Sequence, residues 1–184
     1  TITWTPNSVI RIGNETATTT SQYKYGTASL YLNNPTATGS AAQNLKLPTF
    51  TISQSTGFSV SFWIYSVMPT LETTFLFDFS SVVGGGNNMM LNSTSANSYA
   101  FYSNYTSSSA AVSTSTGVLK LNQWSHVCIT ISTTNFTTIY VDSVSVYSGT
   151  PVGNAFAGTA KTGAMLGATY FGSKGLNGYV DDFK

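Results

Sequence analysis

GFSVSFWIYS, from Gly57 to Ser66, is the stretch of this sequence that decides its fold. Apolar residues alternate with other residues along it, and successive side chains of a β-strand point to opposite faces of a sheet. One face would carry Phe58, Val60, Phe62 and Ile64, and the other would carry Ser59, Ser61, Trp63 and Tyr65. The pattern predicts a strand that turns its first face to a core and presents two aromatic rings on its second.

The same alternation returns in QWSHVCITIS, residues 123–132. One predicted face holds Val127, Ile129 and Ile131, and the other holds Trp124, His126, Cys128 and Thr130. TIYVDSVSVYSG, residues 138–149, predicts a hairpin that turns at Asp142-Ser143. Glycine is the usual second residue of such a turn because a positive φ is needed there.

Further strand-like runs occupy residues 28–34, 74–80, 98–105, 164–172 and 176–183, and helix signals are almost absent. About a dozen short strands, with turn residues every 8–12 positions, are typical of a β-sandwich. The sequence therefore predicts an all-β fold, a two-sheet antiparallel β-sandwich of the jelly-roll type, as one domain over residues 1–184. Because the chain starts at Thr1 without Met, we expect it to be a segment of a larger protein.

Charge is scarce: only 7% of the residues are Asp, Glu, Lys or Arg, against roughly 25% in an average soluble domain. Fifty-five Ser and Thr and 14 Asn residues imply a surface of hydroxyls and amides. Such a surface fits packing in an assembly, glycosylation, contact with sugars, or simply a compositional preference of the lineage. A net charge of +1 without a basic cluster argues against a nucleic-acid partner. No apolar run approaches the ~18–20 residues of a membrane span.

Catalytic groups are equally scarce. The two glutamates, Glu15 and Glu72, have no second acid within five positions. His126 is the only histidine, and no Gly-x-Ser-x-Gly turn accompanies it. His126 and Cys128, the only cysteine, would share a strand face, but an apolar setting should raise the pKa of the thiol. One His and one Cys cannot fill a usual zinc site. We therefore expect no enzyme, no catalytic residues and no metal-ligating cluster.

Several segments in order carry a family resemblance: YKYGTASLYLNN (23–34), FSVSFWIYS (58–66), NQWSHVCITIS (122–132) with the hairpin TIYVDSVSVYSG (138–149), and MLGATYFGSKGLNGYVDDFK (165–184). Over residues 23–184 the chain resembles the laminin G-like domains of the concanavalin A-like lectin/glucanase superfamily. The resemblance implies two antiparallel sheets of six or seven strands. It also implies glycan binding, adhesion or protein recognition, with glycosidase activity in some branches.

Glycosidases of that superfamily place their carboxylates in a Glu-x-Asp-x-x-Glu strand, which this sequence lacks. Relatives often hold calcium between loop oxygens. The carboxylates that could serve here are Asp78, Asp142, Asp181 and Asp182. We expect that no cofactor is required and that the chain holds at most one structural calcium ion.

Two groups of residues are candidates for ligand binding. Trp63 and Tyr65, beside Ser59 and Ser61, have the aromatic and hydroxyl composition of a sugar platform. The alternative is that a crossing loop covers them. The second group comprises Asn87, Asn88, Tyr99 and Tyr102, near Asn97 and Tyr105, and its alternative is ordinary strand packing.

Asp181 and Asp182 stand together in the closing GLNGYVDDFK, residues 175–184. Strict alternation would place Val180 and Phe183 on opposite faces, although both are expected in the core. A β-bulge or bend at the two aspartates would resolve this conflict. We predict such a bulge, with one aspartate accepting hydrogen bonds from backbone N–H groups or helping to hold a cation.

The function that these observations favour is a non-catalytic glycan-binding or adhesion module. Its partner would be a glycan or glycoprotein, and its location extracellular or on a virion or cell surface. One alternative is a structural component of a capsid, fibre or surface layer, in contact with neighbouring subunits. A second alternative is a glycoside hydrolase.

Overall fold

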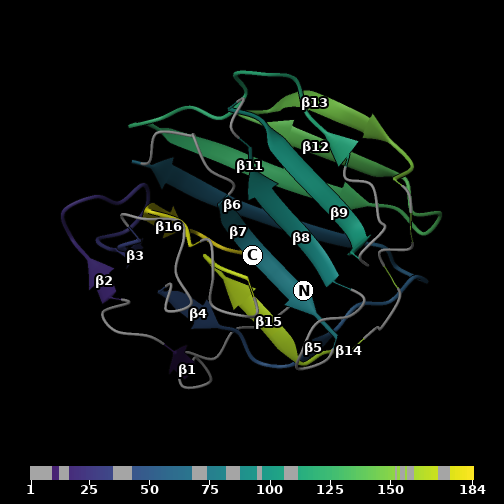
Figure 1. Ribbon diagram of the computed structural model, residues 1–184, viewed down its shortest axis with the longest axis horizontal. Coiled ribbons are helices and arrows are strands. Elements are labelled where there is room, and N and C mark those ends of the chain that lie inside the picture. Colours follow the sequence, from purple (N-terminus) through teal and green to yellow (C-terminus); the bar gives the residue numbers. More distant parts are fainter. Residues whose placement is uncertain are drawn as a thin grey trace.

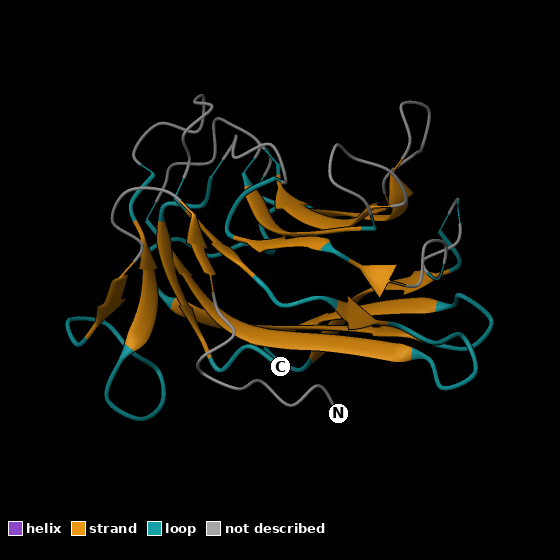
Figure 2. Ribbon diagram, turned by 90° about the horizontal axis from the view of Figure 1, so that it is seen from below, coloured by secondary structure: helices purple, strands orange, loops and turns teal. Residues whose placement is uncertain are grey.

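Two antiparallel sheets of seven strands each lie face to face in the computed structural model of the protein (Figures 1 and 2). The structure describes residues 10–12, 17–34, 43–67, 74–81, 88–94, 97–105, 112–151, 153, 156, 160–169 and 175–184. None of the described residues lies in a helix, and none forms a helical segment that could cross a membrane. The all-β sandwich predicted from the sequence is confirmed.

The first sheet has the strand order β1 (Ile10–Ile12), β4 (Asn44–Lys46), β15 (Gly163–Leu166), β7 (Phe75–Ser80), β8 (Asn88–Ser93), β9 (Tyr99–Tyr105) and β10 (Val112–Ser113). The second has the order β13 (Val144–Gly149), β12 (Thr137–Val141), β11 (Trp124–Ile131), β6 (Phe58–Ser66), β16 (Gly178–Asp181), β3 (Ser29–Leu32) and β2 (Ala17–Thr19). A separate two-stranded sheet joins β5 (Phe50–Thr51) to β14 (Ala160–Lys161).

The core lies between the two large sheets and is rich in phenylalanine. Phe62 of β6 meets Phe77 of β7 edge to face, with ring centroids 6.4 Å apart. Phe77 stacks on Phe79 at 4.4 Å. Along β6 and β11 every second side chain is buried, as the sequence predicts. The alternate residues of both strands, including Trp63 and His126, therefore point away from the core on the outer face of the second sheet.

The hairpin between β12 and β13 turns at Asp142 and Ser143, as predicted. Their φ angles are 49° and 70°, so both residues are left-handed, as in a type I′ turn. Asp142 tolerates this conformation because its carboxylate is held locally: Oδ1 accepts a hydrogen bond from the His126 N–H at 2.8 Å. The Asp142 N–H in turn donates to the His126 carbonyl at 2.9 Å. The turn is thus fixed against β11.

The closing strand β16 is an inner strand of its sheet and lies between β6 and β3 (Figure 1). Asp181 lies opposite Trp63, and Lys184 exchanges backbone hydrogen bonds of 2.9 and 3.0 Å with Ser61. The closing segment therefore uses one residue more than β6 between these two points, which is a β-bulge. The φ of Asp182 is 49°. The extra residue lets Phe183 stack on Phe62 at 5.7 Å, so the predicted bulge is confirmed.

Candidate functional site

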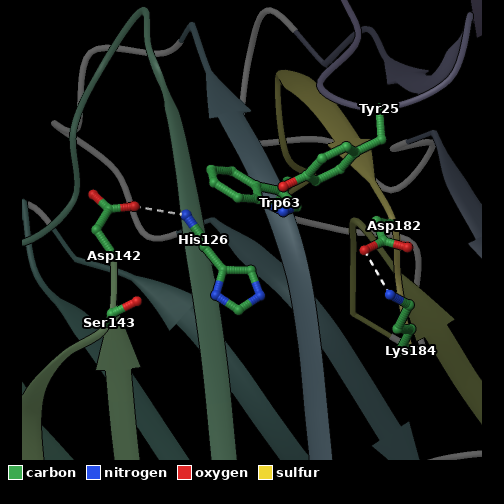
Figure 3. A pocket seen from close by; sticks show the side chains of 7 residues that line it. All are labelled: Tyr25, Trp63, His126, Asp142, Ser143, Asp182 and Lys184. Carbon is green, nitrogen blue, oxygen red and sulfur yellow. Dashed lines mark hydrogen bonds and ion pairs between the residues drawn. The ribbon is translucent and has the colours of Figure 1, made fainter.

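A pocket of about 720 Å³ lies over β6 and β11 on the outer face of the second sheet. Figure 3 shows the side chains that line it: Tyr25, Trp63, His126, Asp142, Ser143, Asp182 and Lys184. They come from β6, β11, two turns and the loop that precedes β3. The pocket is therefore made by parts of the chain that are far apart in sequence.

The base of the pocket is formed by Trp63 and His126. The two residues are directly opposite in the β6–β11 register, and their ring centroids are 5.1 Å apart with the planes tilted by 46°. Both side chains are half-buried. Because the neighbouring residues of each strand enter the core, local alternation alone fixes both rings on this face.

One wall of the pocket comes from the loop between β2 and β3, residues 20–28. The Tyr25 ring meets the Trp63 ring edge to face at 5.7 Å, and Figure 3 shows its hydroxyl over the indole. Lys24 Nζ lies 4.3 Å from the centroid of the same indole, which is a cation–π contact. The loop therefore partly covers Trp63, as the alternative interpretation of the sequence held, and in doing so it builds the pocket.

Asp181 fixes this loop. Its Oδ2 accepts hydrogen bonds from the backbone N–H groups of Lys24 at 2.7 Å and Tyr25 at 2.9 Å. Its Oδ1 accepts the N–H of Asp182 at 2.7 Å. The prediction that one aspartate of the closing pair binds backbone N–H groups is confirmed, and Asp181 is the residue that does so.

The opposite wall carries Asp142. Its Oδ2 lies 2.7 Å from Lys120 Nζ. Partial burial acts to raise the pKa of the Asp142 carboxyl, but the hydrogen bonds from Lys120 and the His126 N–H, with the lysine charge, bring it below its ordinary value. This carboxylate is ionised at neutral pH.

Asp182 and Lys184 form the third side of the pocket. Asp182 Oδ2 lies 2.8 Å from Lys184 Nζ, and the two side chains are 34% and 68% exposed. Figure 3 shows the imidazole of His126 between this pair on one side and Asp142 with Ser143 on the other. The pocket therefore offers aromatic surface at its base and carboxylate oxygens on two sides.

Trp63 is the one predicted ligand-binding residue that lines this pocket. Tyr65 belongs to a neighbouring aromatic row that crosses four strands. Its ring lies 5.7 Å from both Trp124 and Tyr179, and Tyr179 stacks on Tyr31 at 4.9 Å. Tyr65 therefore flanks the pocket and contacts other rings of the row edge to face.

The second predicted group of ligand-binding residues is not brought to the pocket. Asn87 lies outside the described residues, and Asn88 begins β8 in the first sheet. Tyr99 is 0% exposed in the core, where no ligand can reach its ring, so its selection as a surface residue is corrected. Tyr102 lies three residues further along β9 and is half-buried in that same first sheet.

Several lining residues were not predicted as ligand-binding: Tyr25, His126, Asp142, Ser143, Asp182 and Lys184. His126 was recognisable as an outward residue of its strand, but only the pairing of β11 with β6 shows that it adjoins Trp63.

Burial raises the pKa of the nearby Cys128 thiol, as predicted, which disfavours a nucleophilic role for it. Within the described ranges, no group of three or more His, Cys, Asp or Glu side chains is arranged so that it could hold a metal ion. That no cofactor is required, and that the chain holds at most one structural calcium ion, stay predictions.

A family model described as the concanavalin A-like lectin/glucanases superfamily matches residues 38–184. The fold is similar to that of the CBM40 module of a Ruminococcus gnavus IT-sialidase bound to α2,3-sialyllactose, with a TM-score of 0.57, 10% identity and coverage of 75% of this chain and 88% of that one. It is similar to sheep galectin-11, with a TM-score of 0.52, 10% identity and coverage of 75% and 98%. It is also similar to part of a Trypanosoma rangeli sialidase, with a TM-score of 0.59, 14% identity and coverage of 95% and 29%. No curated protein sequence matches the chain. At these identities the likeness shows the fold alone.

Proposed function

The chain belongs to the concanavalin A-like lectin/glucanases superfamily, and from this premise we propose that it is a non-catalytic glycan-binding module. Its ligand would sit in the pocket over Trp63 and His126. Members of this fold class include the sialyllactose-bound CBM40 module and galectin-11. The fold makes sugar binding a reasonable expectation, and the pocket supplies the chemistry.

The observation that carries the proposal is the indole of Trp63 at the base of a pocket walled by carboxylates. A sugar ring has apolar C–H faces and hydroxyl edges. The rings of Trp63 and Tyr25 suit the faces, and the oxygens of Asp142 and Asp182 suit hydroxyl donors. Hydrogen bonds from hydroxyls to ionised carboxylates are roughly twice as strong as neutral ones.

The same carboxylates support binding without hydrolysis. A glycosidase needs one carboxyl with a raised pKa to protonate the leaving oxygen. The pKa of Asp142 is instead lowered by its hydrogen bonds. The carboxylate of Asp182 is paired with Lys184. A glycoside hydrolase remains the lesser alternative, and incubation with neutral polysaccharides, followed by reducing-end analysis, would reveal any cleavage.

The decisive experiment compares two tryptophans of the same outer face on a glycan array. Trp63→Ala removes the base of the pocket, whereas Trp124→Ala removes a ring of the neighbouring aromatic row. We expect wild type and Trp124→Ala to bind the same glycans and Trp63→Ala to bind at least about fivefold more weakly, since losing a stacked ring costs about 1–3 kcal/mol. Equal binding by both variants, or no binding by the wild type, would contradict the proposal.

We further propose an extracellular or virion-surface location, with adhesion to glycans or glycoproteins as the role. The scarcity of charge, 7% of all residues, also suits a subunit packed in a capsid, fibre or surface layer. Sedimentation over a wide concentration range separates these roles. A module that works alone stays monomeric, whereas an assembly subunit associates as its concentration rises.

A further inference from the structure

Among the described residues, the lining of the pocket carries more negative than positive charge. Two of these side chains are carboxylates, Asp142 and Asp182, and one is a lysine, Lys184. Lys120, which pairs with Asp142, is not among these lining residues. Lys24 also lies outside the lining, with its Nζ over the Trp63 ring.

Of the three described lysines near the pocket, Lys120 and Lys184 are paired with its carboxylates, and Lys24 contacts the Trp63 ring. Lys120 Nζ lies 2.7 Å from Asp142 and Lys184 Nζ lies 2.8 Å from Asp182. To form an ion pair with Lys184, an acidic ligand would have to draw this lysine away from Asp182. The Asp182 carboxylate would then face the negative charge of the ligand. A hydroxyl ligand needs no such rearrangement, because each carboxylate oxygen can accept more than one hydrogen bond.

The two carboxylates lie on opposite sides of His126 (Figure 3). Asp142 occupies the left-handed turn before β13, and Asp182 is the left-handed residue of the bulge after β16. Hydrogen bonds to the N–H of His126 and to Lys120 orient Asp142. A ligand over the Trp63 and His126 rings therefore meets carboxylate oxygens from two directions.

We infer that this pocket selects neutral sugars and rejects glycans that carry a carboxylate or sulfate on the bound residue. The inference rests on the proposed function and names its ligand class. It separates this chain from the CBM40 module of similar fold, whose structure contains a sialylated sugar. The difference follows from the side chains in the pocket and not from the fold.

The test is a set of matched glycan pairs, such as lactose with 3′-sialyllactose and lactose with 3′-sulfolactose, together with a wider array of such pairs. We expect each neutral member to bind at least about tenfold more tightly than its acidic partner, because an acidic group bound in the pocket would lie beside Asp142 and Asp182, and like charges repel. The ratio should shrink as salt is raised from 0.02 to ~0.5 M. Acidic members that bind as well as their neutral partners would overturn the inference and leave the proposed function standing. Binding to no glycan of either kind would overturn both.

Two single substitutions should change the ratio of neutral to acidic affinity in opposite directions. Asp182→Asn removes one negative charge and keeps a residue type that tolerates a positive φ. It should weaken binding of the neutral sugar and lower the neutral-to-acidic ratio several-fold. Lys184→Gln removes the positive charge of the lining and should raise that ratio. Ratios that stay unchanged in both variants, with folding verified by circular dichroism, would show that these charges do not set the selectivity.

Discussion

Asp181 and Tyr25 are 156 residues apart in the chain and are joined by a hydrogen bond of 2.9 Å from the Tyr25 N–H to the Asp181 carboxylate. The same oxygen accepts the N–H of Lys24. The side chains of both loop residues contact the Trp63 ring. The closing strand thus determines where one wall of the pocket stands, although Asp181 itself does not line that pocket.

Asp181→Asn should loosen the loop at residues 20–28 without unfolding the domain. The amide leaves one oxygen for three N–H donors, so we expect a loss of about 1–3 kcal/mol in the local opening free energy. Hydrogen exchange should speed up at the amides of Lys24 and Tyr25, and glycan affinity should fall several-fold. Asp182→Asn is the matched control, because it alters the pocket and should leave exchange in the loop unchanged. Unaltered exchange in Asp181→Asn would show that other contacts hold the loop.

Phe183→Ala should destabilise the domain. Removing a buried phenylalanine usually costs about 3–5 kcal/mol, and we expect a value near the lower end of this range because the Phe183 side chain is only partly buried. Phe183 packs between the sheets, 5.7 Å from Phe62 and 6.3 Å from Phe79. Tyr23→Ala removes an aromatic ring that is 48% exposed and should change stability by less than about 0.5 kcal/mol. Urea unfolding of the two variants measures the difference. Equal urea midpoints of unfolding for the two variants would mean that the bulge does not place the Phe183 ring in the core.

Gly57 and Gly26 form a natural pair for a backbone experiment, since their φ angles are +70° and +65°. A Cβ at Gly57 would lie 2.6 Å from the carbonyl oxygen of Ile131, whereas one at Gly26 would meet nothing within 4 Å. Gly26→Ala should therefore cost only the conformational strain, about 1 kcal/mol. Gly57→Ala should cost clearly more, because the first residues of β6 must also move away from β11. Thermal melts compare the two, and equal shifts would argue against the close approach.

Lys161 should make stability rise with pH in the alkaline range. Its side chain is fully buried, and desolvation lowers its pKa to about 8 despite the nearby charge of Asp78. An unfolded lysine titrates near 10.4. Between these two values the unfolded chain holds more protons than the folded one, so the free energy of unfolding increases with pH.

Lys161→Met should remove this rise. Denaturant titrations at pH 7.5, 9 and 10.5 measure the free energy of unfolding of both proteins. The value for wild type minus the value for the variant should increase with pH. Burial raises the pKa values of Cys128 and Tyr99, which act in the opposite direction above pH 9. Because the variant keeps both groups, the difference between the two proteins isolates Lys161. A difference that is flat with pH would contradict the lowered pKa.

Local alternation was sufficient to predict the parts of the fold that depend on neighbouring residues. It placed Trp63 and His126 outward, and the conflict between Val180 and Phe183 located the bulge. It could also have corrected one mistake, because Tyr99 and Tyr102 are an odd number of residues apart on β9 and cannot share a face. Tyr99 lies on the inner face with Phe101, and both are fully buried.

The composition of the pocket could not be predicted in this way. Tyr25 reaches Trp63 only because Asp181 binds its loop, and Asp142 reaches His126 only through the register of β11 with β12. Neither relationship has a local signal. Asp181 binds the loop, whereas Asp182 lines the pocket. This difference likewise depends on the direction in which the bulge turns each side chain.

The inner position of β16 has a consequence for the order in which the protein can fold during synthesis. β6 and β3 emerge from the ribosome more than a hundred residues before the strand that fits between them. Until residues 178–184 emerge, both strands present unpaired backbone edges, the kind of surface on which partly made chains stick to one another. We expect nascent chains that stop short of Gly178 to recruit chaperones, and the chaperones to be released once β16 has emerged.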